Sequence, residues 1–307
     1  MDNINQKNDE IDIKLLLSKI WDEKISILVI TFLFSIASLI YALTLKDIYK
    51  SNVVIAPVND ESSVTSSLRN YSSIANLAGI SLPASSAQNK SVEAIEIIDS
   101  LGFFTSNILP KISLPDLMAV EKWNKDSNEL IYNNQIYDTK LKKWIIENKT
   151  SESKPTAQQA YKKFQQNLLI THDIAKGFYR ISIKHQSPYI AKEWLELIIK
   201  EINLDLRDKG KKEALLAIEF LTTQMSSANL SEIKNLLSNL IQNEIRKLTL
   251  IEANDEYVFK TLDPAHVPEI KSEPNRSFIL FFGTIIGMLV GMFFVLSKAF
   301  FLNKEKL

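Results

Sequence analysis

The 307-residue chain contains no cysteine, only 7 glycines and no excess of either charge. Without cysteine it cannot form disulfides, use a catalytic thiolate or bind a metal through sulfur. Its 36 basic residues balance 36 acidic residues. Because nucleic-acid binding depends on a basic excess, this balance gives no reason to expect a nucleic-acid partner.

Sequence motifs of catalysis and of cofactor binding are also missing. The three histidines, His172, His185 and His266, are far apart and do not have the spacing of a zinc site. The chain has no Gly-x-Ser-x-Gly nucleophile motif and no phosphate-binding Gly-x-x-x-x-Gly-Lys loop. We therefore predict a protein with no enzyme activity, no metal and no cofactor.

The alternative is a membrane-anchored periplasmic enzyme that processes glycans. Such an enzyme needs a convergent pair of carboxyl groups, one of them acting as a general acid. Nothing in the sequence brings such a pair together, and solvated surface carboxylates are the simpler interpretation. The candidates are Asp99, Asp116, Glu121 and Asp126.

Two long apolar segments lie near the ends of the chain, at residues 25–45 and 277–297. A helix rises about 1.5 Å per residue, so each segment is long enough to cross a hydrocarbon core of about 30 Å. A cleaved signal peptide is the alternative for the first segment, but its apolar core is usually only about 7–15 residues long. We predict a retained transmembrane helix, surrounded by membrane lipid, in both segments.

Two spans place both ends of the chain on the same side of the membrane. Lysines are slightly more frequent in the tails, residues 1–24 and 298–307, than at the inner flanks of the two spans. This bias favours tails in the cytoplasm. Residues 46–276 are then a periplasmic domain, and the protein is a two-pass inner-membrane protein.

Three of the few glycines lie in the second apolar segment, at Gly283, Gly287 and Gly291. A spacing of four residues places all three on one helix face, where small residues let two helix backbones approach closely. The simpler interpretation is that glycine is common in membrane helices. We favour a helix–helix contact on this face, and expect it to pack against a neighbouring subunit.

The periplasmic domain has the pattern of a mixed α+β fold. Strands are predicted at residues 49–56 and 257–262, and most clearly at 179–184, where apolar and polar residues alternate. Ser91 and Pro155 are each predicted to open a helix. Residues 110–150 have weak periodicity and are expected to form helices and turns.

Ser187 and Pro188 begin the longest helical pattern, which extends over residues 188–250. Poor helix propensity at 226–229 favours a kink there. The apolar stripe of this pattern is too long to be covered within one domain, so we expect part of residues 207–248 to face another copy of the chain. The interface candidates in its second half are Ile233, Leu237, Ile241, Ile245 and Leu248.

A proline-rich connector, residues 263–276, joins the domain to the second apolar segment. Its proline residues make an extended, stiff segment. It resembles the segment before the second membrane helix in the Wzz chain-length determinants, the polysaccharide co-polymerases. Residues 11–16, 20–21 and 74–83 also resemble this family. The connector residues that carry the resemblance include Pro264, Pro268, Pro274 and Arg276.

The resemblance implies an α/β domain at the membrane, a long helix that extends into the periplasm, and a ring-like homo-oligomer. It also implies a function: such proteins set the modal length of lipid-linked polysaccharide, such as the O-antigen of lipopolysaccharide, that a Wzy-type polymerase makes. The expected partners are therefore other copies of the chain, the polymerase and the lipid-linked polysaccharide. Relatives with a cytoplasmic kinase are excluded, because the phosphate-binding loop is missing.

Overall fold

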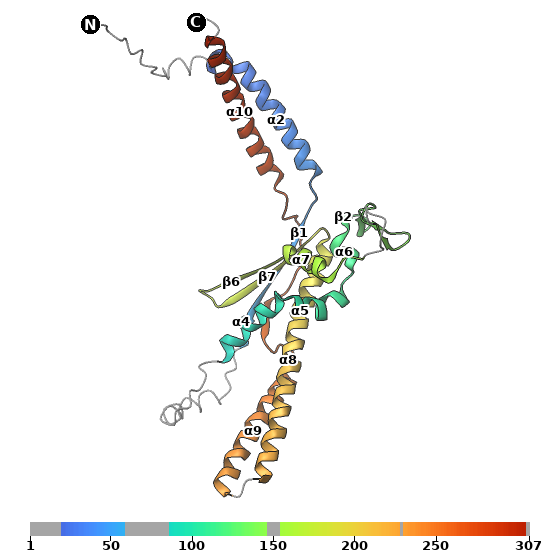
Figure 1. The fold of residues 1–307 in the computed structure, drawn as a ribbon, viewed down its shortest axis with the longest axis vertical. Helices are drawn as coiled ribbons and strands as arrows, with labels where there is room; N and C mark the ends of the chain where they lie inside the picture. The colour runs from blue at the N-terminus through green and yellow to red at the C-terminus, as the bar shows by residue number, and fades with distance from the viewer. Residues whose placement is uncertain (1–19, 59–85, 146–153, 228–229, 305–307) are drawn as a thin grey trace, which may run out of the picture. The chain divides into compact units, whose positions relative to one another are not determined.

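The computed structural model describes residues 20–58, 86–145, 154–227 and 230–304, and the chain divides into two compact units (Figure 1). One unit combines the two ends, Met1–Asp47 and Ser272–Leu307. The other, Ile48–Lys271, is called the central domain below. Strands occur only in the central domain among the described residues, and the predicted mixed fold with apolar terminal helices is confirmed.

The terminal unit is a pair of apolar helices, α2 (Lys24–Thr44) and α10 (Arg276–Lys304). Both have the length and composition of a membrane span, with a mean hydropathy of 2.4 in α2 and 2.6 in α10. Most large side chains of both helices are exposed, including Phe32 and Phe293. A buried core helix would cover such side chains, so the exposure is typical of helices surrounded by lipid.

The central domain is built on a four-stranded antiparallel sheet in the order β6-β7-β1-β8. The strands are β1 (Tyr49–Pro57), β6 (Leu168–Asp173), β7 (Phe178–His185) and β8 (Phe259–Asp263). Strand β1 confirms the strand predicted at 49–56, and β7 confirms the alternating strand predicted at 179–184. The predicted strand at 257–262 begins two residues later, because Tyr257 instead lies against Gly210 of helix α8.

Helices cover one face of this sheet and complete a single apolar core. They are α4 (Ser86–Ile98), α5 (Leu101–Phe103), the π-helix η1 (Phe104–Ile108), η2 (Leu109–Lys111), α6 (Leu114–Met118), α7 (Ala157–Asn167) and the first part of α8 (Pro188–Ser227). Inward side chains of β1 and β7, such as Ile55 and Ile181, contribute to the same core as Ile198 of α8. The core thus holds α8 firmly at its N-terminal end.

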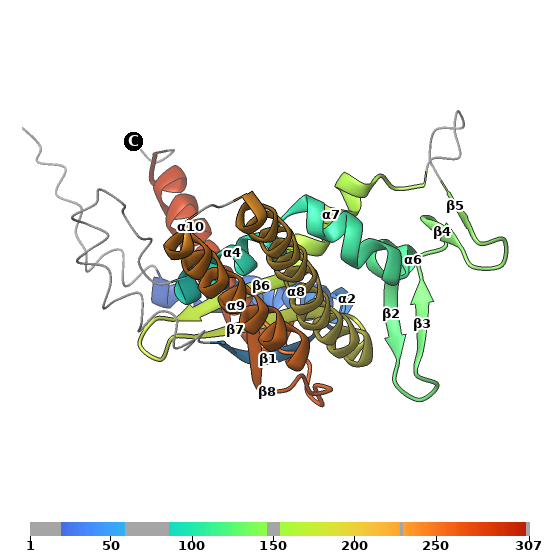
Figure 2. The same ribbon diagram turned by 90° about the horizontal axis from the view of Figure 1, so that it is seen from below.

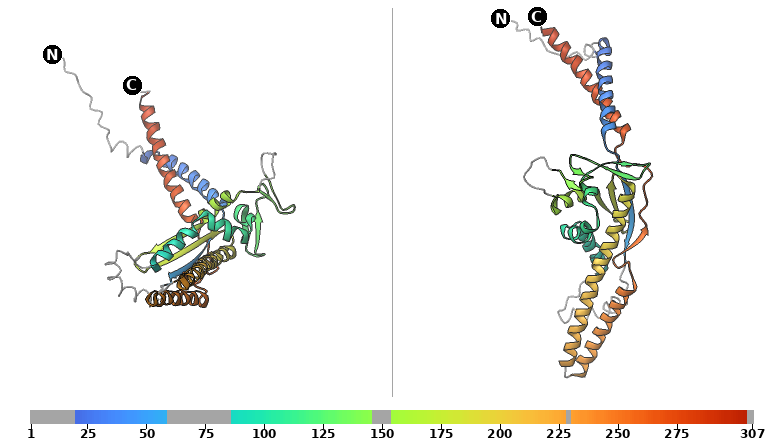
Figure 3. Two further views of the ribbon diagram at one scale, coloured as in Figure 1. Left: turned by 60° about the horizontal axis from the view of Figure 1, so that its bottom comes forward. Right: turned by 90° about the vertical axis from the view of Figure 1, so that its right-hand side faces the viewer.

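The predicted single helix over 188–250 is wrong beyond Ser227. The chain turns back there, and α9 (Ser231–Ala253) packs beside α8 (Figures 1 and 3). An ion pair between Lys211 and Glu252 joins the two helices, and one between Arg207 and Asp255 joins α8 to the segment just after α9. In one long helix, the apolar stripe would remain in water. Two shorter helices are more stable, because α9 can pack its apolar face against α8.

Residues 110–150 do not form only helices and turns as predicted. They contain two small β-hairpins, β2 (Val120–Asn124) with β3 (Glu129–Tyr132), and β4 (Tyr137–Asp138) with β5 (Lys143–Trp144). Figure 2 shows the hairpins beside α6. Alternation is hard to see in such short strands, which are rich in Lys and Asn, so the sequence pattern did not reveal them.

Two helix starts also differ from the prediction. Helix α4 begins at Ser86, so Ser91 is a buried residue inside the helix and not its cap. Helix α7 begins after Pro155, where the side chains of Thr156 and Gln159 form a reciprocal capping box with the backbone. The Thr156 side chain therefore satisfies the N–H group of Gln159, and the Gln159 side chain satisfies that of Thr156.

Asn203 connects the core part of α8 to strand β8. Its side-chain oxygen accepts hydrogen bonds from the backbone N–H groups of Val258 (2.9 Å) and Phe259 (3.0 Å). Its side-chain NH2 group donates to the carbonyl oxygens of Ile199 (3.1 Å) and Phe259 (3.2 Å). Asn203 is only 5% exposed, and Val258 and Phe259 are also buried. Its hydrogen bonds therefore satisfy backbone groups of these two residues that water does not reach.

Candidate membrane and interaction surfaces

The three glycines of α10 are buried against α2 of the same chain. A Cβ atom added at Gly283 would lie 1.6 Å from the Oγ atom of Ser38. A Cβ atom at Gly287 would lie 3.1 Å from the backbone of Thr31, and one at Gly291 would lie 3.2 Å from the backbone of Ile27. Only glycine therefore allows this close backbone approach along more than two turns of helix.

This arrangement corrects one expectation about the glycine face. The glycine spacing led us to expect a contact with a neighbouring subunit on this face, but α2 of the same chain occupies it. The apolar side chains that α10 leaves exposed are on its other sides, among them Phe281, Leu289 and Phe293. The glycines thus define the terminal helix pair itself.

Polar contacts hold the terminal helix pair at both ends and near its middle. At one end, Arg276 Nη2 lies 2.9 Å from Asp47 Oδ1, and Arg276 Nε donates to the carbonyl oxygen of Ala42 at 3.2 Å. At the other end, Lys298 Nζ lies 2.6 Å from Glu23 Oε1. Between them, the hydroxyl groups of Ser35 and Thr284 are 3.0 Å apart and share a hydrogen bond.

These contacts give Arg276 a definite role. Its guanidinium group neutralises Asp47 and also satisfies a carbonyl group in the last turn of α2, which has no partner within the helix. Sequence reasoning placed Arg276 in the connector but missed Asp47 and Glu23. Both acids flank an apolar segment closely, which is the signal that could have identified them.

The proline residues of the connector have different surroundings. Pro264 lines a groove of the central domain, whereas Pro268 and Pro274 are half-buried. Beside them, the carbonyl group of His266 accepts a hydrogen bond from Ser51 Oγ at 2.8 Å. The connector therefore runs along β1 at the end of the sheet where this strand begins.

The five interface candidates of α9 divide into two groups. Leu237, Ile241 and Leu248 are half-buried, whereas Ile233 and Ile245 are exposed at 43% and 48%. Other large apolar side chains of the α8–α9 pair are also exposed, namely Leu215, Leu216, Phe220, Leu236, Leu240 and Leu250. The pair thus retains an apolar surface that this chain does not cover.

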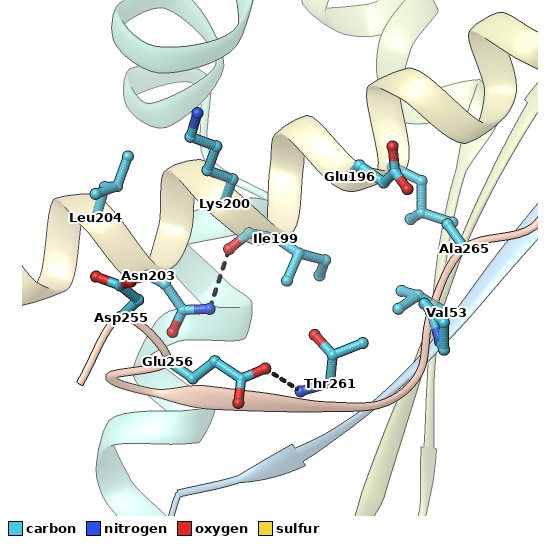
Figure 4. A pocket seen from close by; sticks show the side chains of 12 residues that line it. Val53, Glu196, Ile199, Lys200, Asn203, Leu204, Asp255, Glu256, Thr261 and Ala265 are labelled. Carbon is cyan, nitrogen blue, oxygen red and sulfur yellow. Dashed lines mark hydrogen bonds between the residues drawn. The ribbon is translucent and has the colours of Figure 1, made fainter.

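A groove of about 490 Å³ lies between α8, β1 and the segment around β8 (Figure 4). Apolar residues, among them Val53 and Ile199, line it together with the charged residues Glu196, Lys200 and Glu256. Glu256 Oε1 accepts a hydrogen bond from the backbone N–H of Thr261 at 2.9 Å. Since the side chain of Asn203 is also hydrogen-bonded within the domain, these two polar groups of the groove serve the fold.

Two of the four carboxyl groups considered for glycan cleavage, those of Asp99 and Asp116, have structural partners. Asp99 accepts a hydrogen bond from the amide group of Gln165 at 3.1 Å. Asp116 accepts hydrogen bonds from Ser113 (2.9 Å) and from the hydroxyl group of Tyr132 (2.7 Å). Burial and the bond to Asp116 raise the pKa of Tyr132. Asp116 thus links the residue before α6, Ser113, to Tyr132 of β3.

His185 is a buried structural residue. Its Nδ1 atom accepts a hydrogen bond from the backbone N–H of Ser187 at 2.9 Å, so its Nε2 atom donates to the carbonyl oxygen of Asp116 at 2.9 Å. Burial lowers the pKa of this imidazole, which favours the neutral ring. Among the described residues, no group of His, Asp or Glu has the arrangement of a metal site.

Comparison with known protein families gives a match in the N-terminal part of the chain. Residues 9–106 match the model of a family described as Wzz, chain length determinant protein. Within the match, residues 9–19 and 59–85 lie outside the described part of the structure, and they include the family-like segments 11–16 and 74–83. None of the curated proteins compared with the chain matches it.

Two solved structures are among those similar to this chain. A full-length bacterial polysaccharide co-polymerase is 11% identical, with 96% of this chain and 99% of that chain covered and a TM-score of 0.39. A fragment of WzzB, a polysaccharide co-polymerase from Salmonella Typhimurium, is 13% identical, with 74% of this chain and 100% of that chain covered and a TM-score of 0.31. The family match over residues 9–106 thus confirms the resemblance to the Wzz chain length determinants seen in the sequence.

Proposed function

We propose that this protein is a non-catalytic regulator of polysaccharide chain length in a Wzy-dependent pathway, such as the synthesis of lipopolysaccharide O-antigen. The observation that carries the proposal is the family match over residues 9–106. This segment includes α2, β1 and α4, so it joins the apolar anchor to the first strand of the central sheet. The match therefore supports the family's function for a chain in which this anchor and this strand are directly connected.

The terminal helix pair would anchor the protein in the bacterial inner membrane with both termini in the cytoplasm. Its two helices run antiparallel, and an ion pair joins them at each end. Such pairs at the ends keep the charges out of the hydrocarbon, where an ionised side chain is costly. The lysines of the tails support the cytoplasmic side for the termini.

The α8–α9 pair would extend from the domain into the periplasm and contact other copies of the chain. Helix α8 has 40 residues, so at about 1.5 Å per residue it is roughly 60 Å long, and only its first part lies in the core. The exposed apolar side chains of the pair support a homo-oligomer, in a ring-like arrangement, as the working form. Polymerase and lipid-linked glycan would then meet on one assembly.

Deleting the gene should broaden or shift the modal length of the surface polysaccharide, seen as a changed ladder on a gel. The reason is that polymerisation then lacks the component that ends or extends each chain in a regulated way. A plasmid copy of the wild-type gene should restore the ladder. A ladder that the deletion leaves unchanged would contradict the proposal.

The enzymatic alternative has a separate test. Purified protein in detergent, mixed with isolated polysaccharide, should leave the length distribution unchanged on the same gel. Shortening of the glycan by the protein alone would instead support a glycan-processing enzyme.

A further inference from the structure

The β4–β5 hairpin has two different faces. On one face, Tyr137 and Trp144 are directly paired, with ring centroids 5.1 Å apart, and Tyr137 also contacts Tyr132 at 5.9 Å. The next pair of residues, Ile136 and Ile145, lies on the other face. A hydrogen bond from the backbone N–H of Ile145 to the carbonyl oxygen of Ile136 joins this pair. Ile136 and Ile145 are 39% and 45% exposed. The hairpin thus has an inner aromatic face and an outer aliphatic face.

The turn of this hairpin presents an exposed leucine in a fixed position. Leu141 is 68% exposed, between Lys140 and Lys142. Asp138 Oδ1 accepts hydrogen bonds from the backbone N–H groups of Lys140 (2.8 Å) and Leu141 (3.0 Å). This side-chain turn fixes the backbone, although Leu141 contributes little to the core of its own domain. A rigid, exposed leucine between lysines favours a contact outside the domain.

Contacts within the central domain place both β-hairpins at the end of the sheet where the chain enters from α2. Tyr49, the first residue of β1, lies opposite His185 in the sheet, and His185 bonds to Asp116, the partner of Tyr132. The ring of Trp123 in β2 lies 5.4 Å from that of Tyr49. The exposed aliphatic residues at this end, called the hairpin surface below, are Ile131, Ile136, Leu141 and Ile145.

Chain length limits how far this end can be from the membrane if α2 spans it, as proposed above. Helix α2 ends at Thr44 and β1 begins at Tyr49. Since an extended chain spans at most about 3.6 Å per residue, Tyr49 lies within roughly 18 Å of Thr44. The polar headgroup layer itself occupies several ångströms on each side of the hydrocarbon. Tyr49 and Trp123 are therefore close enough to reach this layer.

We infer that the hairpin surface contacts the phospholipid interface of the membrane, with Leu141 inserted at the boundary of headgroups and acyl chains. Exposed aliphatic side chains with lysines beside them are typical of segments that lie at this depth of a membrane, and Leu141 lies between Lys140 and Lys142. The lysines beside Leu141 match the negative charge of bacterial phospholipids. A second membrane contact besides α2 and α10 would fix the tilt of the central domain.

Depth-dependent fluorescence quenching tests this contact on the full-length protein. Because the natural chain has no cysteine, Leu141→Cys alone can carry a bimane fluorophore in vesicles of phosphatidylethanolamine and phosphatidylglycerol. Nitroxide lipids should quench it, more strongly with the nitroxide near the headgroup than near the methyl end. Leu230→Cys, which follows the far end of α8 and is 60% exposed, should stay unquenched.

Leu289→Cys on α10 distinguishes a failure of the hairpin contact from a failure of the proposed membrane spans. If bimane at Leu289→Cys is quenched and bimane at Leu141→Cys is not, the helix pair is in lipid and the hairpin contact is refuted. Quenching at neither position refutes the membrane spans as well. A blue-shifted but unquenched bimane at Leu141→Cys would show a protein–protein contact in place of lipid, which also overturns the inference.

Discussion

Replacing Asn203 with alanine is expected to destabilise the central domain by about 3–5 kcal/mol. The substitution removes the acceptor of two buried N–H groups, those of Val258 and Phe259, and each buried group left without a partner costs about 1–3 kcal/mol. It also removes the donor for the carbonyl oxygens of Ile199 and Phe259. Denaturant unfolding of the purified protein in detergent, followed by tryptophan fluorescence, measures the loss.

The matched control is Asn239→Ala, an exposed asparagine of α9. This change leaves no buried group unpaired, and alanine is the better helix former, so stability should be unchanged or slightly higher. If Asn203→Ala costs no more than Asn239→Ala, the link between α8 and β8 described above is incorrect.

Replacing Gly287 with leucine is expected to separate α2 from α10. Even a Cβ atom there would lie 2.6 Å from Phe34 Cβ and 3.1 Å from the backbone of Thr31, and a backbone cannot move aside as a side chain can. Overpacking of this kind costs about 1–3 kcal/mol, which lowers the equilibrium constant for closing the helix pair roughly 5- to 150-fold.

A disulfide between Ser35→Cys and Thr284→Cys measures that closeness. The two hydroxyl groups are 3.0 Å apart, so the substituted thiols are near enough to be oxidised to a bridge. Mass-tagging of the remaining free thiols after denaturation gives the bridged fraction. We expect that fraction to be high in the parent protein, low with Gly287→Leu, and high again with Met288→Leu on an exposed position of the same helix. Equal bridging in both variants would contradict the glycine contact.

Local patterns were sufficient to predict part of the fold. The alternation in β7 reflects one face toward the core and one toward solvent, so it is visible in sequence. The start of α8 at Pro188 follows from two adjacent residues: the capping serine, Ser187, comes just before the helix, and the proline is its first residue. In both cases the determining interactions lie within a few residues.

The path of the chain after Ser227 depends on contacts between distant residues. Poor helix propensity at residues 226–229 indicated a kink, but a full reversal requires α9 to pack on α8. The ion pair of Arg207 with Asp255 and the bonds of Asn203 to Phe259 join residues that no local pattern connects. The long apolar stripe was therefore assigned to one helix when it belongs to two.

For the candidate surfaces too, local sequence predicted some features, whereas others depend on contacts between distant residues. The spacing of Gly283, Gly287 and Gly291 predicted a close helix contact, because a helix face can be derived from spacing alone. The identity of the partner could not be derived in this way, and α2 of the same chain covers the face. The exposed Leu141 was missed because a single leucine between lysines has no periodicity.

Labelling of single cysteines in whole cells tests most directly the claim that α2 and α10 anchor one domain on one side of the membrane. The natural chain has no cysteine, so Leu230→Cys, between α8 and α9, and Asn303→Cys, near the end of α10, each provide one thiol. In cells with a permeable outer membrane, an impermeant maleimide should label Leu230→Cys and should reach Asn303→Cys only after lysis. Equal labelling of both thiols in intact cells, or labelling of Asn303→Cys alone, would contradict the account.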